Sequence, residues 1–167
     1  MLFLVPGRTP MFPTAQAIRP DEQGLVALGG DLRPETLVEA YRKGIFPWEG
    51  SQPIPWFSPD PRAVLVPRAF RAHRSLQKRA RQGRYRVTLD TDFEGVLHGC
   101  ATAGGRGEFG TWINGAIPRA YRLLHEHGVV HSVETWDGET LVGGLYGLAI
   151  GRAFFGESMF HLSLIHI

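Results

Sequence analysis

The pattern of hydrophobic and polar positions changes along the chain from helical spacing to the alternation of strands. Apolar residues recur every three or four positions in two segments, each bounded by residues typical of helix ends. These predicted helices run from Pro34 to Lys43, with Gly44 as the stop, and from Gly115 to His127, with Asn114 as the cap. Two further helices are predicted within 70–81 and over 93–98.

Strand patterns dominate the second half. Strands are predicted at 85–89, 129–136, 139–148 and 153–160. Asp137-Gly138 is a typical two-residue hairpin signal between two of them. The first third instead carries ten prolines, which disfavour long regular elements, and an aromatic cluster (Phe46, Trp48, Trp56, Phe57) that predicts a small core. An α-rich first half followed by an antiparallel meander indicates an α+β fold.

Composition agrees with a water-soluble protein. Hydrophobic residues make up 43% and charged residues 20% of the 167 positions. No apolar run approaches the roughly 20 residues that span a bilayer, so no membrane association is expected. The apolar start is interrupted at Pro6, too early for a secretory signal. Because Cys100 is the only cysteine, we expect a reducing, cytoplasmic location and a buried, unreactive thiol.

Basic residues concentrate in one stretch. Residues 68–86 contain eight Lys or Arg and no Asp or Glu, whereas the remaining chain holds ten basic and sixteen acidic residues. Such a stripe on an acidic body predicts a polyanionic partner, although many charge runs are only solvated helix faces. The residues that we expect to contact RNA phosphates are Arg74, Lys78, Arg79, Arg81 and Arg84.

Several motifs occur together in a fixed order between residues 12 and 160. They are Ala27-Leu-Gly-Gly-Asp-Leu32, Tyr41-Arg-Lys-Gly-Ile-Phe-Pro-Trp48, Trp56-Phe-Ser-Pro-Asp-Pro-Arg62, Gly110-Thr-Trp-Ile113, His131-Ser-Val-Glu134, Leu141-Val-Gly-Gly-Leu-Tyr-Gly147 and Phe155-Gly-Glu-Ser-Met-Phe160. In sequence and spacing they resemble the leucyl/phenylalanyl-tRNA–protein transferases. This combination is far more specific than any single glycine-rich match.

The resemblance implies a small N-terminal domain (1–66) joined to part of a domain like the GNAT-type acetyltransferases (67–161). Its members transfer Leu or Phe from Leu-tRNA or Phe-tRNA to proteins that begin with Arg or Lys, which marks them for degradation. The partners are thus aminoacyl-tRNA and acceptor proteins, and neither a metal nor an organic cofactor is implied.

The family's substrate site corresponds to a set of aromatic and apolar positions with one carboxylate. These are Tyr41, Trp48, Trp112, Tyr121, Leu145, Phe154, Glu157 and Met159. Trp48 and Trp112 have the chemistry to stack on the terminal adenine, and a methionine suits a pocket for both branched and aromatic side chains. Taken singly, each aromatic residue is equally explained as core, and Glu157 as a surface acid on an edge strand.

Other motif interpretations fail. His125 and Glu126 begin a zinc-like H-E-x-x-H pattern, but Val129 occupies the second histidine position. Gly104-Gly-Arg-Gly107 lacks the Gly-Lys-Ser/Thr of a phosphate-binding P-loop. Two alternatives stay open on the residues alone: an acyl-CoA-dependent acetyltransferase of the same fold, and a non-catalytic RNA-binding module.

The end of the chain departs from the family. An Asp-x-Gln motif that the family uses in proton transfer follows the Phe155–Phe160 motif by about one helix and does not occur here. We therefore expect this polypeptide to be inactive by itself. Residues 162–167 (Leu-Ser-Leu-Ile-His-Ile) can be encoded by a sequence resembling a transposon-end adapter, which predicts a non-native tail. The alternative is a short final strand, since the residues alternate.

Overall fold

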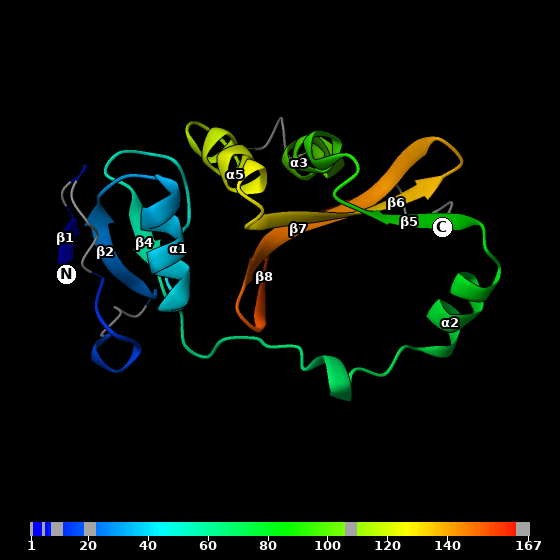
Figure 1. Ribbon diagram of the computed structural model, residues 1–167, viewed down its shortest axis with the longest axis horizontal. Helices are drawn as coiled ribbons and strands as arrows, with labels where there is room; N and C mark the ends of the chain where they lie inside the picture. The colour runs from blue at the N-terminus through cyan, green and yellow to red at the C-terminus, as the bar shows by residue number, and fades with distance from the viewer. Residues whose placement is uncertain (1, 5, 8–11, 19–22, 106–109, 163–167) are drawn as a thin grey trace.

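The computed structural model describes residues 2–4, 6–7, 12–18, 23–105 and 110–162. These residues form two four-stranded sheets and four α-helices, which confirms the α+β prediction. Figure 1 shows the first sheet and helix α1 at the N-terminal end, and the second sheet beside them under helices α3 and α5.

The first sheet is built from short strands. It consists of β1 (Leu2–Leu4), β2 (Leu25–Gly29), β3 (Phe46–Pro47) and β4 (Pro55–Phe57), in the order β1-β2-β4-β3. Only the β1–β2 pair is parallel. A short 3-10 turn (Ala15–Ala17) precedes β2. Of the predicted aromatic cluster only Trp56 is fully buried, with its ring edge-on to Phe12 at 4.8 Å.

Helix α1 (Pro34–Arg42) lies where the periodicity predicted it, and a glycine with φ +75° follows its C-cap. Arg33 at its N-cap gives no side-chain cap. Asp31 binds the first turn instead: its carboxylate accepts hydrogen bonds from Thr36 Oγ1 at 2.6 Å and from the amides of Arg33 and Gly7. An acid at this end also interacts favourably with the helix dipole.

The second sheet is an antiparallel meander. Its strands are β5 (Tyr85–Leu89), β6 (Val130–Asp137), β7 (Thr140–Ile150) and β8 (Ala153–His161), in sequential order. Helices α3 (Phe93–Thr102) and α5 (Ile117–Glu126) cover one face. Asp92 caps the N-terminus of α3, and the helix runs beyond the predicted 93–98 because the apolar spacing continues to Cys100, which is buried. A 3-10 turn (Ala103–Gly105) ends it.

Two predictions of element ends were wrong. Asn114 does not cap α5, because its side-chain amide donates to the carbonyl of Thr111 at 2.6 Å. The helix begins later, at Ile117, since Pro118 suits the first helical turn. In the hairpin, Asp137 belongs to β6 and pairs with Thr140, so the turn lies one residue further on, at 138–139.

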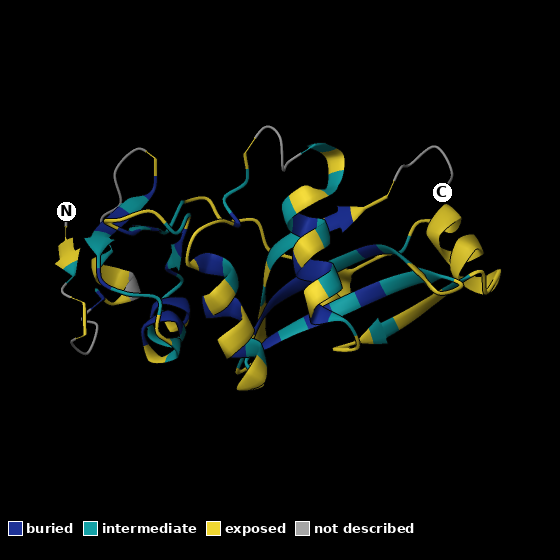
Figure 2. Ribbon diagram, turned by 90° about the horizontal axis from the view of Figure 1, so that it is seen from above, coloured by how far each residue is buried: buried dark blue, intermediate teal, exposed yellow. Residues whose placement is uncertain are grey.

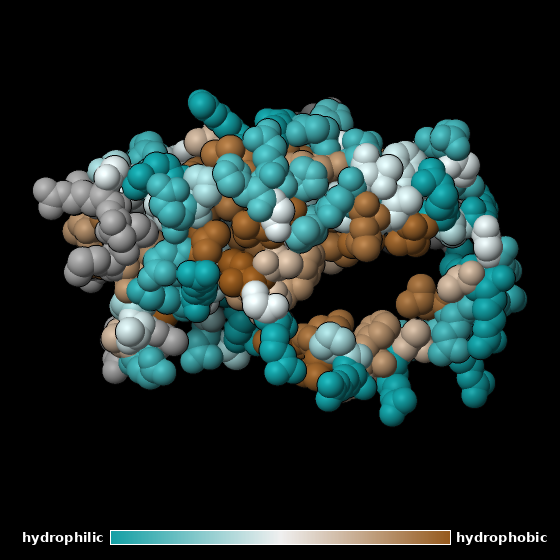
Figure 3. All heavy atoms as spheres, in the orientation of Figure 1, coloured by the Kyte–Doolittle hydropathy of each residue, from teal (hydrophilic) through white to brown (hydrophobic). Residues whose placement is uncertain are grey.

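The helix predicted within 70–81 is present and is shorter than that segment. Helix α2 covers only Arg74–Arg81, because Pro67 starts a separate 3-10 turn (Pro67–Ala69) and the backbone is extended at Phe70 and His73. This connecting segment (residues 58–84) runs opposite the face of the second sheet that α3 and α5 leave open. The space-filling view shows an opening between them with apolar side chains on both sides (Figure 3).

One hydrophobic core joins the two sheets. Tyr41 from α1, Trp56 from β4, Tyr121 from α5 and Tyr146 from β7 belong to the same buried cluster. Figure 2 shows one buried side on α1 and α5, whereas α2 is exposed all round. The domain boundary at 66/67 and the non-native tail at 162–167 stay predictions; of the tail, only Leu162 is among the described residues.

Candidate functional site

A cleft lies between the first sheet and the middle of β8. It has a volume of about 230 Å³ and is lined by Phe46, Pro47, Trp48, Arg62, Trp112, Gly156 and Glu157. Pockets that enclose a drug-sized ligand usually measure roughly 300–1,000 Å³. The cleft therefore suits a group of about one ring system rather than a whole nucleotide with its amino acid.

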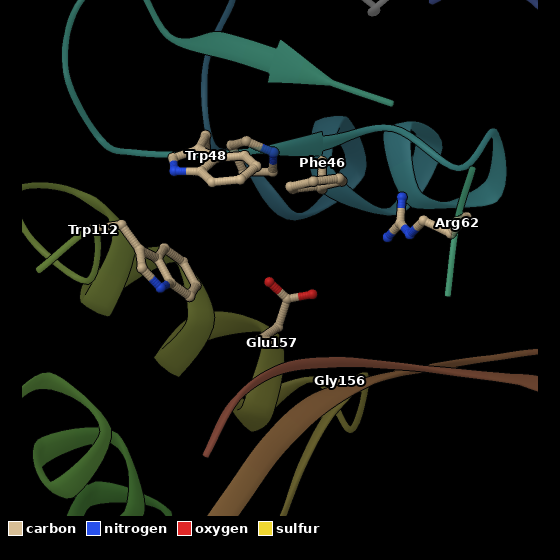
Figure 4. A pocket seen from close by; sticks show the side chains of 7 residues that line it. Phe46, Trp48, Arg62, Trp112, Gly156 and Glu157 are labelled. Atoms are coloured by element: carbon tan, nitrogen blue, oxygen red, sulfur yellow. The ribbon is translucent and has the colours of Figure 1, made fainter. Parts of the chain in front are cut away.

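Two tryptophans stand at one end of this cleft. Trp48 follows β3 and is 51% exposed, with its indole near the rings of Phe46 (5.9 Å between centroids) and Phe57 (5.2 Å). Trp112 is half-buried in the turn before α5, where its carbonyl accepts from the amide of Asn114. Figure 4 shows both indoles beside the same space, so the tertiary structure joins residues 64 positions apart in sequence.

Glu157 points into the cleft because β8 carries a bulge. Gly156 pairs with Gly147 and Ser158 with Tyr146, which leaves Glu157 as the extra residue without a partner on β7. A bulge re-aims a side chain away from the regular alternation of the strand. The Glu157 carboxyl accordingly faces the space between Trp112 and Arg62 (Figure 4). β8 is an edge strand, but Glu157 is partly buried rather than on an open surface.

The environment of this carboxyl favours its protonated form. Burial raises the pKa of Glu157 to about 7, against the lowering effect of the Tyr41 and Tyr121 hydroxyls and of the Arg62 charge. Tyr121 Oη donates to Glu157 Oε2 at 3.1 Å. A carboxyl with a pKa near 7 exchanges its proton readily at neutral pH, which is unusual for glutamate and typical of functional sites.

Tyr41 and Tyr121 lie behind Glu157, outside the lining of the cleft. Their hydroxyl oxygens are 2.6 Å apart, and both side chains are almost completely buried. Burial and the nearby charge of Glu157 raise the pKa of both phenols well above 10. They therefore stay neutral and act only as hydrogen-bonding groups.

The remaining predicted pocket residues gather elsewhere. Leu145 and Met159 pair across β7 and β8 and line a groove of about 670 Å³ on the open face of the sheet. Phe154 faces the same side, because its ring lies over Gly147, where a side-chain carbon would come within 2.7 Å of it. Phe154 is 51% and Met159 65% exposed, so this face presents apolar side chains to solvent.

The predicted basic contacts lie mainly on α2, whose residues are all exposed. In the described part of the chain, Arg74, Lys78, Arg79 and Arg81 enter no ion pair. Arg84 differs, since its guanidinium binds the Asp137 carboxylate through Nε at 3.1 Å and through Nη2. The four predicted phosphate contacts without an ion pair thus all lie on α2, whereas the charge of Arg84 is already neutralised by Asp137.

The sequence did not predict Phe46, Arg62 or Gly156 as site residues, and Phe46 was expected in a small aromatic core, yet all three line the cleft. Arg62 places its guanidinium 4.7 Å from the centre of the Phe46 ring and donates to the carbonyl of Gly44. All three residues occur within motifs quoted above. Phe46 and Arg62 could have been selected from the sequence as an aromatic and a charged residue within the quoted motifs.

The histidines that suggested zinc have other partners. His125 Nδ1 lies 2.9 Å from the carbonyl oxygen of Val130, and its ring stacks on Phe93 with 4.3 Å between centroids. His131 Nδ1 lies 2.7 Å from an Asp90 carboxylate oxygen. Within the described ranges no three His, Cys, Asp or Glu side chains gather as metal ligands. No helix in these ranges combines the length and apolarity needed to cross a bilayer.

Comparison with known proteins identifies the family. The profile of the leucyl/phenylalanyl-tRNA protein transferases matches residues 64–164, and that of their N-terminal domain matches residues 30–60. The chain belongs to this family. The leucyl/phenylalanyl-tRNA–protein transferase of Ectopseudomonas mendocina is 56% identical over 149 residues, which are 89% of this chain and 65% of that protein.

Further relatives agree. The transferase of Anaeromyxobacter sp. strain K is 52% identical over 95% of this chain and 67% of its own length, and that of Dechloromonas aromatica is 52% identical over 92% and 66%. The chain thus spans about two thirds of the length of these relatives. Its membership confirms the resemblance seen in the motifs.

Proposed function

We propose that the protein, at the length of its relatives, transfers Leu or Phe from aminoacyl-tRNA to the N-terminal Arg or Lys of acceptor proteins. Family membership carries this proposal. The cleft supports it, because two indoles and a carboxyl with a pKa of about 7 surround one space. Stacking of a base on an aromatic ring contributes about 1–3 kcal/mol, which suits Trp48 and Trp112 as the platform for the terminal adenine.

The reaction needs positioning more than strong acid–base chemistry. The α-amine of the acceptor attacks the ester carbonyl of the aminoacyl-tRNA; a C–N bond forms, the C–O ester bond breaks, and the ribose hydroxyl leaves with a proton. An α-amine has a pKa of roughly 7.7–8, so a useful fraction is neutral at physiological pH. In this proposal, Glu157 accepts a hydrogen bond from a substrate amine or hydroxyl in the cleft.

The apolar groove suits the amino-acid side chain. Leu145 and Met159 form part of its lining, and Phe154 projects from the same face of the sheet. Glu157 and Met159 are two positions apart on β8, so the cleft and the groove approach each other along this strand. An aminoacyl ester that runs from the indoles to the groove passes the Glu157 carboxyl.

Single-turnover kinetics with the complete gene product test the activity. Radiolabelled Phe-tRNA should transfer Phe to a protein that begins with Arg, whereas the same protein with an N-terminal Met is the control. Labelled acetyl-CoA in a parallel reaction tests the acetyltransferase alternative. Acetyl transfer without Phe transfer would overturn the proposal, and tRNA binding without either transfer would support a non-catalytic RNA-binding module.

Helix α2 provides the surface for the tRNA phosphates in this proposal. Replacing Arg74, Lys78, Arg79 and Arg81 together by Gln should weaken tRNA binding and flatten its salt dependence by roughly 0.7–0.9 in log–log slope for each lost contact. Arg119→Gln, an exposed arginine on α5, is the matched control. If the quadruple variant keeps the wild-type salt slope, α2 is only a solvated surface.

A further inference from the structure

The carboxyl of Glu157 is the last member of a chain of hydrogen bonds. Tyr121 donates its single hydroxyl hydrogen to Glu157, so it has none left for Tyr41. The short contact between the two phenols therefore requires Tyr41 to donate to Tyr121. The donors run in one direction, from α1 through α5 to the bulge in β8, and they end on the Glu157 carboxyl, whose pKa the Tyr41 hydroxyl also lowers.

Neither phenol is placed to meet a substrate. Tyr41 is 1% and Tyr121 0% exposed, and neither ring lines the cleft. Tyr41 packs edge-on against Phe155 at 5.4 Å, and Tyr121 against Tyr146 at 5.8 Å. The rings are thus locked by the core, which fixes the hydroxyl groups with little freedom to rotate away.

We propose that Tyr41 and Tyr121 are positioning residues, which orient and ionise Glu157 from behind rather than contact the aminoacyl-tRNA. Two neutral donors favour the charged form of a carboxyl that burial otherwise neutralises. This inference rests on the proposed function. Tyr41 and Tyr121, which the family resemblance grouped with the substrate site, thus act on the substrate only through Glu157.

Other groups around Glu157 are consistent with this assignment. Arg62, from the segment after β4, contributes a positive charge at the open side of the cleft. Tyr146 of β7 is close enough for the Glu157 charge to raise its pKa, but among the described residues its buried hydroxyl has no hydrogen-bond partner. Tyr146 is thus a natural control: a buried phenol near the same carboxyl, without the bond.

Titration of the carboxyl tests the proposal without any need for activity. The 167-residue chain is labelled with [δ-¹³C]glutamate, and the Glu157 resonance is assigned by its loss in Glu157→Gln. Tyr121→Phe should raise the pKa of Glu157 by about one, since it removes a hydrogen bond to a charged group. Tyr41→Phe should raise it as well, since the Tyr41 hydroxyl also lowers the pKa of this carboxyl, whereas Tyr146→Phe should leave it within about 0.3 of the wild-type value.

Kinetics of the complete gene product separate positioning from substrate contact. Under the proposal, Tyr121→Phe moves the acid limb of kcat/KM to higher pH and leaves the KM for Phe-tRNA within about twofold. An unchanged titration in Tyr121→Phe, or an equal change in Tyr146→Phe, would overturn it. So would a large rise in KM without movement of the acid limb. Failure of Phe transfer would refute the proposed function but leave the titration result intact.

Discussion

The buried carboxylate of Glu134 offers a sharp test of how the second sheet is held together. Its side chain is 0% exposed in the middle of β6. It accepts hydrogen bonds from Ser132 Oγ and from Thr88 Oγ1, each at 2.6 Å, and from the amide of Asp92 at 3.5 Å. These donors connect β6 with β5 and with the start of α3, so Glu134 joins three elements.

Glu134→Ala should lower the free energy of unfolding by about 3–5 kcal/mol. The buried Ser132 hydroxyl and the half-buried Thr88 hydroxyl lose their acceptor, at about 1–2 kcal/mol each, and the lost side chain leaves a cavity. Urea unfolding followed by tryptophan fluorescence measures this as a lower midpoint at constant m-value. Glu139→Ala, in the exposed hairpin turn, is the control and should change stability by less than about 0.5 kcal/mol.

The loss should also depend on pH. Burial alone would raise the pKa of Glu134, but hydrogen bonds from Ser132, Thr88 and backbone amides hold it below its ordinary value of 4.5. A lowered pKa stabilises the fold above pH 4.5, and this stabilisation disappears as the pH falls through the folded-state value. The difference between wild type and Glu134→Ala should therefore shrink below pH 4.5. A difference that stays constant from pH 7 to pH 3, or that equals that of Glu139→Ala, would refute the reasoning.

Three further outcomes are expected. Gly99→Ala should lower the urea midpoint by the equivalent of about 1–3 kcal/mol, because the added carbon would lie 2.6 Å from the Phe160 ring, whereas Gly156→Ala meets no atom within 4 Å. Trp112→Ala in the complete protein should reduce kcat/KM for Phe-tRNA by the equivalent of about 1–3 kcal/mol, and wild-type kinetics in a folded variant would exclude Trp112 from the site. Asp31→Ala should cost about 1–2 kcal/mol by releasing the first turn of α1, and equal thermal unfolding of variant and wild type would contradict this.

Local sequence determined much of the second half of the protein. The alternation at 85–89 and 153–160 gave strands close to those limits, and the apolar spacing before Gly128 gave α5. Such patterns predict the position of a strand or helix reliably, because the spacing of apolar residues reflects the one side of the element that is buried. The ends were less predictable: Asn114 and Asp137 have side chains suited to several turn geometries, and neighbouring Pro118 and Gly138 decided between them. The motifs, by contrast, were sufficient to predict the family, because their order and spacing extend over most of the chain.

Only the tertiary structure decided how the candidate site is assembled. No local pattern reports that β8 contains a bulge at Glu157, since the register depends on the partner strand. Nor does sequence show that Tyr41 and Tyr121, 80 positions apart, share a hydrogen bond in the core. The same structure placed Leu145 and Met159 in a separate groove, although the family resemblance grouped them with the tryptophans. Sequence thus determined which residue types are available for chemistry, and the packing of α1 and α5 against the bulged strand decided which of them meet, because burial and hydrogen-bond direction are properties of the assembled core.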